Sequence, residues 1–230
     1  MTRLLIVTAV AAERDAVLAG RSPVAGELAG YPVCRASTGA GLVDVVAGGV
    51  GAAAAAVATT ALLPTGYAAV LATGIAGGLP PAAIGELVVA DRVVFADLGA
   101  ELADGGFAGL TELGLGDPEL PADPALAVEL TRRTGARLGT VLSVNTVTGT
   151  EQRAARLRAA HPTALAEGME GAAVALAAAR AGVPFGELRA ISNPVGPRDR
   201  DAWQLGTALA ALTAGFDLLL SSPLPEGAVR

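Results

Sequence analysis

The chain has 230 residues, of which 52% are hydrophobic, 17% are charged and only 3% are aromatic. Such a composition supplies a sizeable buried core of Ala, Val and Leu and excludes a disordered chain. The net charge of −6 argues against a nucleic-acid partner, because phosphate binding needs clustered basic residues. The single Cys34 and single His161 leave no intrachain disulfide and no zinc ligand set.

Two apolar segments invite a membrane interpretation. Residues 1–12 mimic a short signal peptide, but the charged Glu13-Arg14-Asp15 follows at once, which favours a buried strand and a helix start. The uncharged stretch between Asp44 and Glu86 is long enough to span a bilayer. It is built of Ala and Gly and is split near Pro64, so we predict no membrane span and a cytoplasmic protein.

Apolar runs, helical periodicity and Gly/Pro breaks predict the following elements in chain order. Strands are expected over 4–7, 31–37, 68–72, 86–96, 138–144 and 185–192. Helices are expected over 12–19, 42–63, 124–134, 150–160, 170–181 and 199–220. Tight turns are expected at 38–41 and 73–78, and residues 99–124 are expected to form a long, functional loop.

The alternation of strands and helices predicts one three-layer α/β domain over residues 1–230, with a central mixed, largely parallel sheet. In such sheets, the functional site gathers at the carboxyl ends of the strands. Residues 10–13, 73–78, 144–148 and 192–196 fall there, and residues 168–170 open a helix. We therefore expect these five segments to converge.

Glu13 follows the first predicted strand. It is interpreted either as a first-turn acid favoured by the helix dipole or as a general base on a pocket floor. Gly74 and Ile75 belong to the glycine-rich segment TGIAGG, which is either a tight turn or an anion cradle. This segment fits neither dinucleotide nor Walker patterns, so no cofactor is expected.

Glu170 stands at the front of an otherwise apolar helix. A buried carboxylate there needs hydrogen-bond donors, which a ribose diol supplies, although a helix-capping acid is the alternative. Arg189 inside a buried strand calls for a partner. Asn193 at that strand's tip is either a turn residue or a reader of a ligand's polar edge, and Trp203 either belongs to the core or covers a pocket. His161 is interpreted as a surface turn residue.

Four of these segments together resemble the nucleoside phosphorylase and nucleosidase superfamily, particularly the methylthioadenosine/adenosylhomocysteine nucleosidases. Residues 7–17, with Glu13, resemble the strand that carries the family's catalytic Glu. The segments TGIAGGL (73–79), GME (168–170) and RAISN (189–193) resemble the family's TGSAGGL, EME and RAISD. The order and spacing match along nearly the whole chain.

The resemblance implies a role for each matched residue. Glu13 would polarise the attacking water with help from Arg189, Glu170 would bind the ribose hydroxyls, and Met169 would lie against the sugar. Further members of the implied site are the glycine segment with Gly74 and Ile75, the backbone at Val147 and Thr148 beside the base, and an aromatic ring at Trp203.

Two departures from the family pattern indicate the subtype. Asn193 replaces an Asp that protonates adenine, and an amide suits a 6-oxopurine better because it both donates and accepts. Ile75 replaces a hydroxyl residue, which favours water over phosphate as the nucleophile. Residues 192–203 also resemble the corresponding loop of the futalosine hydrolases, whose substrate carries a benzoate on its 5′ extension. Arg198 and Arg200 are candidates to meet that carboxylate.

The resemblance thus implies hydrolysis of a hypoxanthine nucleoside, most closely futalosine in menaquinone biosynthesis. The alternatives are a methylthioadenosine nucleosidase, a purine nucleoside phosphorylase and a nucleoside-binding protein without turnover. A homo-oligomer is expected by analogy, with the loop 99–116 closing the 5′ end of a neighbouring site.

Overall fold

The apolar first strand of the chain lies inside the central sheet, with a neighbouring strand on each side. The computed structural model describes residues 2–229. Its strands are β1 Arg3–Thr8, β2 Val24–Leu28, β3 Tyr31–Thr38, β4 Gly41–Ala47, β5 Ala69–Gly78, β6 Leu87–Phe95, β7 Gly99–Glu101, β8 Phe107–Gly109, β9 Glu119–Pro121, β10 Arg137–Ser143, β11 Ala164–Gly168 and β12 Phe185–Pro194. The helices are α1 Ala11–Leu18, α2 Ala52–Leu62, the short 3-10 helix η1 Leu63–Thr65, α3 Pro124–Thr134, α4 Glu151–Ala160, α5 Gly171–Ala181 and α6 Leu205–Leu219.

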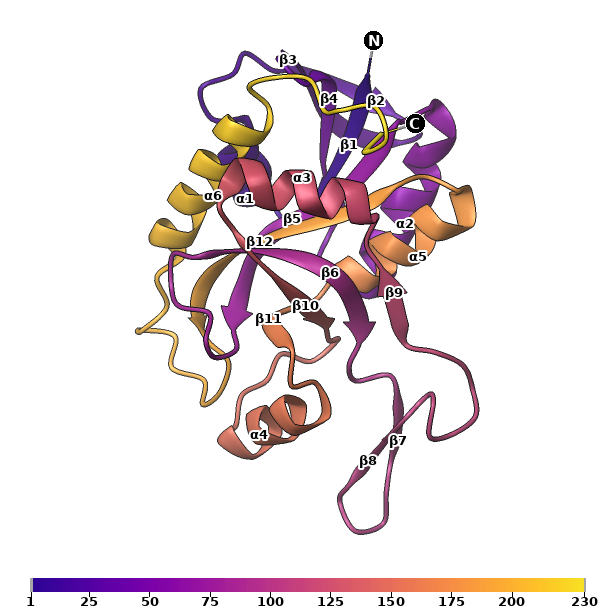
Figure 1. Ribbon diagram of the computed structural model, residues 1–230, viewed down its shortest axis with the longest axis vertical. Coiled ribbons are helices and arrows are strands. Elements are labelled where there is room, and N and C mark those ends of the chain that lie inside the picture. The colour runs from indigo at the N-terminus through magenta and orange to yellow at the C-terminus, as the bar shows by residue number, and fades with distance from the viewer. Residues whose placement is uncertain (1, 230) are drawn as a thin grey trace.

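The sheet is mixed, as predicted. Its order is β11-β10-β6-β12-β5-β1-β4-β3-β2, and β1 pairs in parallel with both β4 and β5. Helices α1 and α6 lie on one side of these strands and α2 and α5 on the other (Figure 1). The sheet is fully covered along β1, where Leu4, Leu5 and Ile6 have no exposed surface. The predicted α/β class is therefore confirmed.

One pairing goes beyond an open sheet. β11 pairs with β10 in parallel and also with β5 in the antiparallel sense, through Ala166–Gly78 and Glu167–Gly77. The strands β5, β12, β6, β10 and β11 therefore close into a ring. A second, smaller apolar cluster lies at this end of the molecule, and it includes Leu142, Val144 and Leu157 of α4.

Several predicted boundaries are wrong. The helix expected over 42–63 is instead β4 followed by α2, because Val43, Val45 and Val46 are buried between β1 and β3. The turn expected at 73–78 is the extended second half of β5. Strands β2 and β11 were not predicted, and α6 begins at Leu205 rather than 199.

The expected loop 99–124 contains three short strands. β9 adds to β6, while β7 and β8 form a separate two-stranded hairpin. Figure 1 shows this hairpin projecting from the end of the molecule opposite the chain termini. Within residues 2–229, no helix combines the length and the apolar character needed to cross a bilayer.

Candidate active site

Glu13 enters the site from the first turn of α1. Its Oε2 accepts hydrogen bonds from the N–H groups of Ala9 at 2.9 Å and Val10 at 3.2 Å, and its Oε1 accepts one from the N–H of Ile75 at 2.9 Å. The side chain is 4% exposed. Glu13 thus caps its own helix, in line with the structural interpretation, and also reaches β5. Its role as a general base stays a prediction.

The close approach of Glu13 to β5 depends on Gly74. A Cβ atom added at this glycine would lie 2.3 Å from Glu13 Oε1, a distance that no side chain can adopt. The glycine-rich segment is therefore not a tight turn. It is a strand whose missing side chains make room for neighbouring polar groups.

Arg189 lies at the centre of a buried charge network. Its Nε donates to Glu187 Oε1 at 2.6 Å, and its Nη1 donates to Glu170 Oε2 at 3.3 Å. Burial by itself lowers the pKa of Arg189, but the carboxylates of Glu187, Glu170 and Glu13 outweigh it and raise the pKa above the ordinary value. The guanidinium is therefore a permanent cation, and the carboxylates of Glu187 and Glu170 are the partners that its buried position calls for.

Glu187 is a member of this network that sequence reasoning missed. It lies two residues before Arg189 on β12, on the same face of the strand, and has no exposed surface. Burial raises the pKa of Glu187, while Arg189 opposes that shift. Within residues 2–229, Glu187 Oε2 and Arg189 Nη2 are buried without a hydrogen-bond partner.

Glu170 stands at the N-cap position of α5, but its side chain does not cap the helix. Its Oε1 accepts a hydrogen bond from the N–H of Gly51 at 3.0 Å, at the start of α2, and its side chain makes no cap hydrogen bond to its own helix. The helix-capping interpretation of Glu170 is therefore wrong. The carboxylate, 6% exposed, instead joins α2 to Arg189, and Met169 beside it is half-buried.

Asn193 lies near the end of β12 and is half-buried. Its Oδ1 accepts from the Ser192 hydroxyl at 2.8 Å, and its Nδ2 donates to the carbonyl of Pro194 at 3.0 Å. Trp203 lies in the loop before α6 rather than in a helix. This loop returns to β12, because the N–H of Gln204 donates to the carbonyl of Ser192 at 2.9 Å.

Val147 and Thr148 occupy the loop after β10. Val147 is 40% exposed and Thr148 is buried. The N–H and the hydroxyl of Thr148 both donate to the carboxylate of Glu167 on β11, at 2.8 and 2.5 Å. Burial raises the pKa of Glu167, and the two Thr148 hydrogen bonds offset that shift only in part. Glu167 is a second acid that sequence reasoning missed, although a charge inside the apolar run 164–168 was visible.

The second half of β5 brings these residues together. Ile75 donates its N–H to Glu13, and its carbonyl lies 3.5 Å from Arg189 Nη1. Gly77 is the register partner of Asn193. Two strand residues span about 7 Å, so Glu13 and Asn193 approach β5 at positions that a single nucleoside can bridge. Glu170 joins the same group through Arg189.

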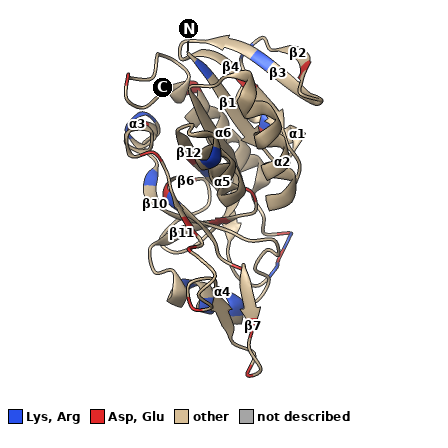
Figure 2. Cartoon of the chain, turned by 90° about the vertical axis from the view of Figure 1, so that its right-hand side faces the viewer, with Lys and Arg blue, Asp and Glu red and all other residues tan. Residues whose placement is uncertain are grey.

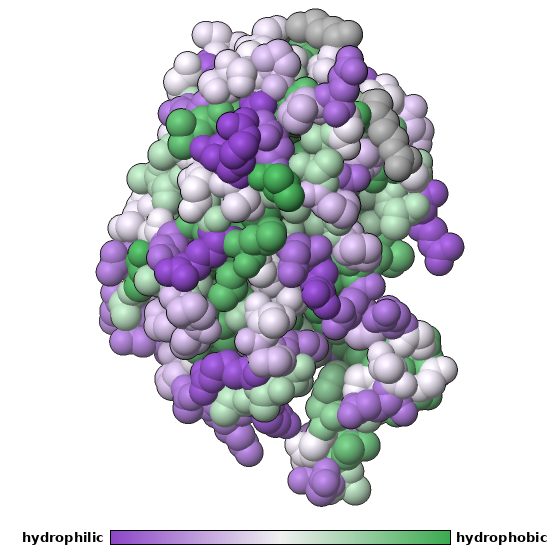
Figure 3. All heavy atoms as spheres, in the orientation of Figure 1, coloured by the Kyte–Doolittle hydropathy of each residue, from purple (hydrophilic) through white to green (hydrophobic). Residues whose placement is uncertain are grey.

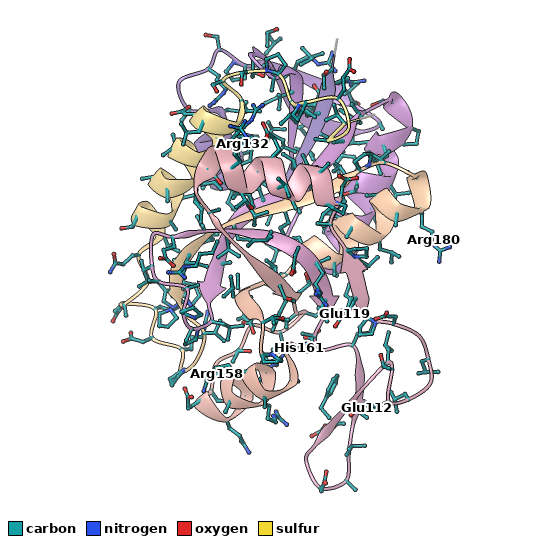
Figure 4. All side chains as sticks on the ribbon, viewed as in Figure 1. Glu112, Glu119, Arg132, Arg158, His161 and Arg180 are labelled. Carbon is teal, nitrogen blue, oxygen red and sulfur yellow. The ribbon has the colours of Figure 1, made fainter. Side chains whose placement is uncertain are left out.

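His161 lies apart from this group, at the end of α4 and close to Arg158 (Figure 4). Burial lowers the pKa of His161, which agrees with a neutral, half-buried helix-end residue. Among residues 2–229 no group of three or more His, Cys, Asp or Glu side chains is arranged to hold a metal ion.

Residues 6–214 match the model of the Phosphorylase superfamily, and the chain belongs to this family. It is 52% identical over 218 residues to futalosine hydrolase of Streptomyces coelicolor, covering 91% of this chain and 92% of that protein. It is 37% identical to futalosine hydrolase of Thermus thermophilus, covering 89% and 91%.

Solved structures show the same fold. The native structure of Helicobacter pylori futalosine hydrolase superposes with a TM-score of 0.82 at 20% identity, covering 95% of this chain and 97% of that one. The methylthioadenosine/adenosylhomocysteine nucleosidase of Colwellia psychrerythraea, in complex with adenine, gives a TM-score of 0.79 at 24% identity, covering 97% and 98%.

Proposed function

We propose that this protein hydrolyses the N-glycosidic bond of a 6-oxopurine nucleoside, with futalosine as substrate and hypoxanthine and dehypoxanthine futalosine as products, in menaquinone biosynthesis. The observation that carries the proposal is the 52% identity to a futalosine hydrolase along 91% of the chain. Asn193 at the end of β12 supports the same substrate class, because its amide both donates and accepts.

In the proposed reaction, Glu13 accepts a proton from water as the water oxygen bonds to the ribose C1′. The bond between C1′ and N9 breaks through an oxocarbenium-like transition state, as in other glycosidic cleavages. Hypoxanthine leaves with the bonding electron pair, is stabilised by hydrogen bonding to Asn193 and takes up a proton from solvent. Glu170 holds the ribose hydroxyls, and Arg189 holds the Glu170 carboxylate in place through its hydrogen bond at 3.3 Å.

Three features favour this reaction over its relatives. The amide of Asn193 cannot protonate adenine as a carboxylic acid would, which disfavours a methylthioadenosine nucleosidase. Ile75 presents an apolar side chain where a phosphorylase needs a hydroxyl, which disfavours phosphate as nucleophile. The approach of Glu13 to β5 at 2.9 Å holds a base inside the site, which a binding protein does not need.

The decisive assay incubates the protein with futalosine, methylthioadenosine and inosine, each with and without phosphate. We expect hypoxanthine release from futalosine at a rate independent of phosphate. Release of adenine from methylthioadenosine at a higher rate, or ribose 1-phosphate formation, would assign the chain to one of the rivals. Glu13→Gln is expected to abolish release while futalosine still binds, since general base catalysis contributes on the order of 10²-fold or more.

We also propose that Arg198 meets the carboxylate of the substrate's 5′ extension. Its guanidinium lies 5.8 Å from the centre of the Trp203 ring, and its N–H donates to the carbonyl of Gly149, next to Thr148, at 3.3 Å. Arg198 is exposed and pairs with no carboxylate within residues 2–229. Arg200, two residues further along the same loop, is the alternative, and the matched variants Arg198→Gln and Arg200→Gln distinguish them by KM.

We further propose a cytoplasmic, single-domain enzyme that assembles into a homo-oligomer. The projecting hairpin and its flanks, residues 98–115, expose several large apolar side chains, namely Leu98, Leu102, Phe107, Leu113 and Leu115. Figure 3 shows this arm as a projection separated from the body of the molecule. Such side chains favour contact with a second copy, and sedimentation velocity tests the proposal.

A further inference from the structure

Glu167 is a buried acid to which the proposed reaction assigns no role. It is 6% exposed, and its described hydrogen bonds come from one residue, Thr148, through the N–H and the hydroxyl. Each carboxylate oxygen thus accepts one hydrogen bond. Because an ionised carboxylate offers about four acceptor positions, both oxygens keep capacity for another donor.

The sheet places Glu167 opposite Asn193. Gly77 on β5 is the register partner of Glu167 on one side and of Asn193 on the other. Cross-strand partners share a face of the sheet, and neighbouring strands lie about 4.8 Å apart, so the two backbones lie roughly 10 Å apart across β5. Two polar side chains at that separation can address the two ends of one purine edge.

Gly77 adds no side chain of its own between them, and the side chains of Val195 and Asn193 lie over this glycine. A Cβ atom added there would lie 2.8 Å from a methyl group of Val195 and 3.6 Å from Asn193 Nδ2. The loop that carries Val147 and Thr148 borders the same space, because Thr148 is the residue that holds Glu167. A flat ligand that contacts Asn193 and this loop therefore also reaches Glu167.

We propose that the Glu167 carboxylate accepts a hydrogen bond from N1–H of the 6-oxopurine and thereby sets the preference for hypoxanthine over adenine. This inference rests on the proposed function. A 6-oxopurine carries a hydrogen at N1, next to O6, whereas the N1 of a 6-aminopurine has only a lone pair. Glu167 pairs with the first and repels the second, while Asn193 addresses the O6 and N7 side.

Two further observations fit this assignment. Burial keeps water away from Glu167, so an unpaired N1 of adenine facing it finds no substitute partner. Sites built to hydrogen-bond a substrate group reject analogues that lack that group by large factors, on the order of 10⁴ in favourable cases. A carboxylate that served only to fix the Thr148 loop would affect both purine classes equally.

The first test measures kcat/KM of the wild type and of Glu167→Gln on futalosine and on its 6-amino analogue. A glutamine replaces one of the two acceptor oxygens with an N–H₂ donor and removes the negative charge that faces N1–H. We expect kcat/KM for futalosine to fall at least 30-fold, on the order expected when a hydrogen-bonded substrate group loses its partner, and the 6-oxo to 6-amino preference to fall at least tenfold. A wild type that hydrolyses futalosine and a variant that keeps its preference would overturn the inference and leave the proposed function intact.

The second test uses the unaltered protein, so it does not depend on how the variant folds. Calorimetry compares hypoxanthine with 1-methylhypoxanthine, which lacks the N1 hydrogen, and with 9-methylhypoxanthine, whose methyl group takes the place of ribose. We expect the 1-methyl base to bind at least tenfold more weakly than the 9-methyl base. Equal affinities would contradict the role of Glu167 whether or not futalosine is the substrate.

Discussion

The buried ion pair between Glu187 and Arg189 makes the most demanding prediction about stability. We expect Glu187→Gln to destabilise the protein, because the guanidinium loses its nearest carboxylate, at 2.6 Å, and keeps only Glu170 at 3.3 Å. Both side chains are at most 1% exposed, so water cannot replace the lost charge. Breaking such a pair typically costs about 3–5 kcal/mol.

That loss translates into a measurable shift in melting temperature. For a domain of this size, 1 kcal/mol lowers Tm by about 2–4 °C, so we expect Glu187→Gln to melt roughly 6–20 °C below the wild type. The matched control is Glu86→Gln, which breaks the exposed pair with Arg137 at 3.0 Å. Exposed pairs contribute about 0–1 kcal/mol, so the control should melt within about 4 °C of the wild type.

The comparison also tests the charge state of Glu187. Burial raises its pKa although Arg189 opposes the shift, and our interpretation requires that the carboxylate is ionised beside the guanidinium. A glutamine mimics a protonated glutamic acid closely. Differential scanning calorimetry showing Glu187→Gln no less stable than Glu86→Gln would therefore refute the ionised pair.

Three further predictions follow from features described above. Gly74→Ala should displace the Glu13 carboxylate, because the new Cβ would lie 2.3 Å from Glu13 Oε1. Hypoxanthine release should then fall on the order of 10²-fold, the contribution that a general base makes to the rate. Normal turnover would argue against Glu13 as the base. Hydrogen bonds from Arg35, Arg3 and Tyr67 overcome burial and lower the pKa of Asp44, so the ionised carboxylate stabilises the fold at neutral pH and this effect is lost as pH falls through the folded-state pKa. The urea midpoints of the wild type and of Asp44→Asn should therefore converge on acidification. A gap between the midpoints that stays constant with pH would contradict this pH dependence. Phe107→Asp with Leu115→Asp, both exposed, should shift sedimentation towards the monomer, and an unchanged profile would exclude the arm from the interface.

The motif residues were predictable because each breaks an apolar run. Glu13, Glu170 and Asn193 do so where a strand ends or a helix begins, and Arg189 does so inside a strand. The α/β alternation indicates which ends converge. Their partners were less accessible. Gly51 holds Glu170 across 119 residues, and no local pattern reports a contact of that range.

The errors share one physical cause. The segment 42–63 is so rich in Ala, Gly and Val that neither the helical nor the strand repeat of hydrophobic residues stands out. A charged residue such as Asp44 is not expected in a buried strand, and its pairing with Arg3 and Arg35 is known only from the structure. Glu167 and Glu187 escaped notice for a related reason. An acid in an apolar run has meaning only when its donor is known, and the donors of Glu167 come from a loop 19 residues away.

Acidic and basic side chains are spread over the outside of the molecule, with several arginines on α4 near the projecting arm (Figure 2). Two of these arginines are paired with carboxylates, Arg153 with Asp97 and Arg158 with Glu151. The loops 144–150 and 195–204 meet just before α4, where the backbone N–H of Arg198 donates to the carbonyl of Gly149 at 3.3 Å.

The additional pairing between β11 and β5 restricts how this end of the sheet can move. Because Gly77 pairs with β12 on one edge and β11 on the other, the strands that carry Glu167 and Asn193 cannot separate without breaking a closed circuit of backbone hydrogen bonds. The end of the sheet that we propose to bind the base is thus a closed frame, and the loops 144–150 and 195–204 lie outside its strand pairing. An enzyme built this way would tolerate wide variation in the 5′ group of its substrate while accepting very little in the purine.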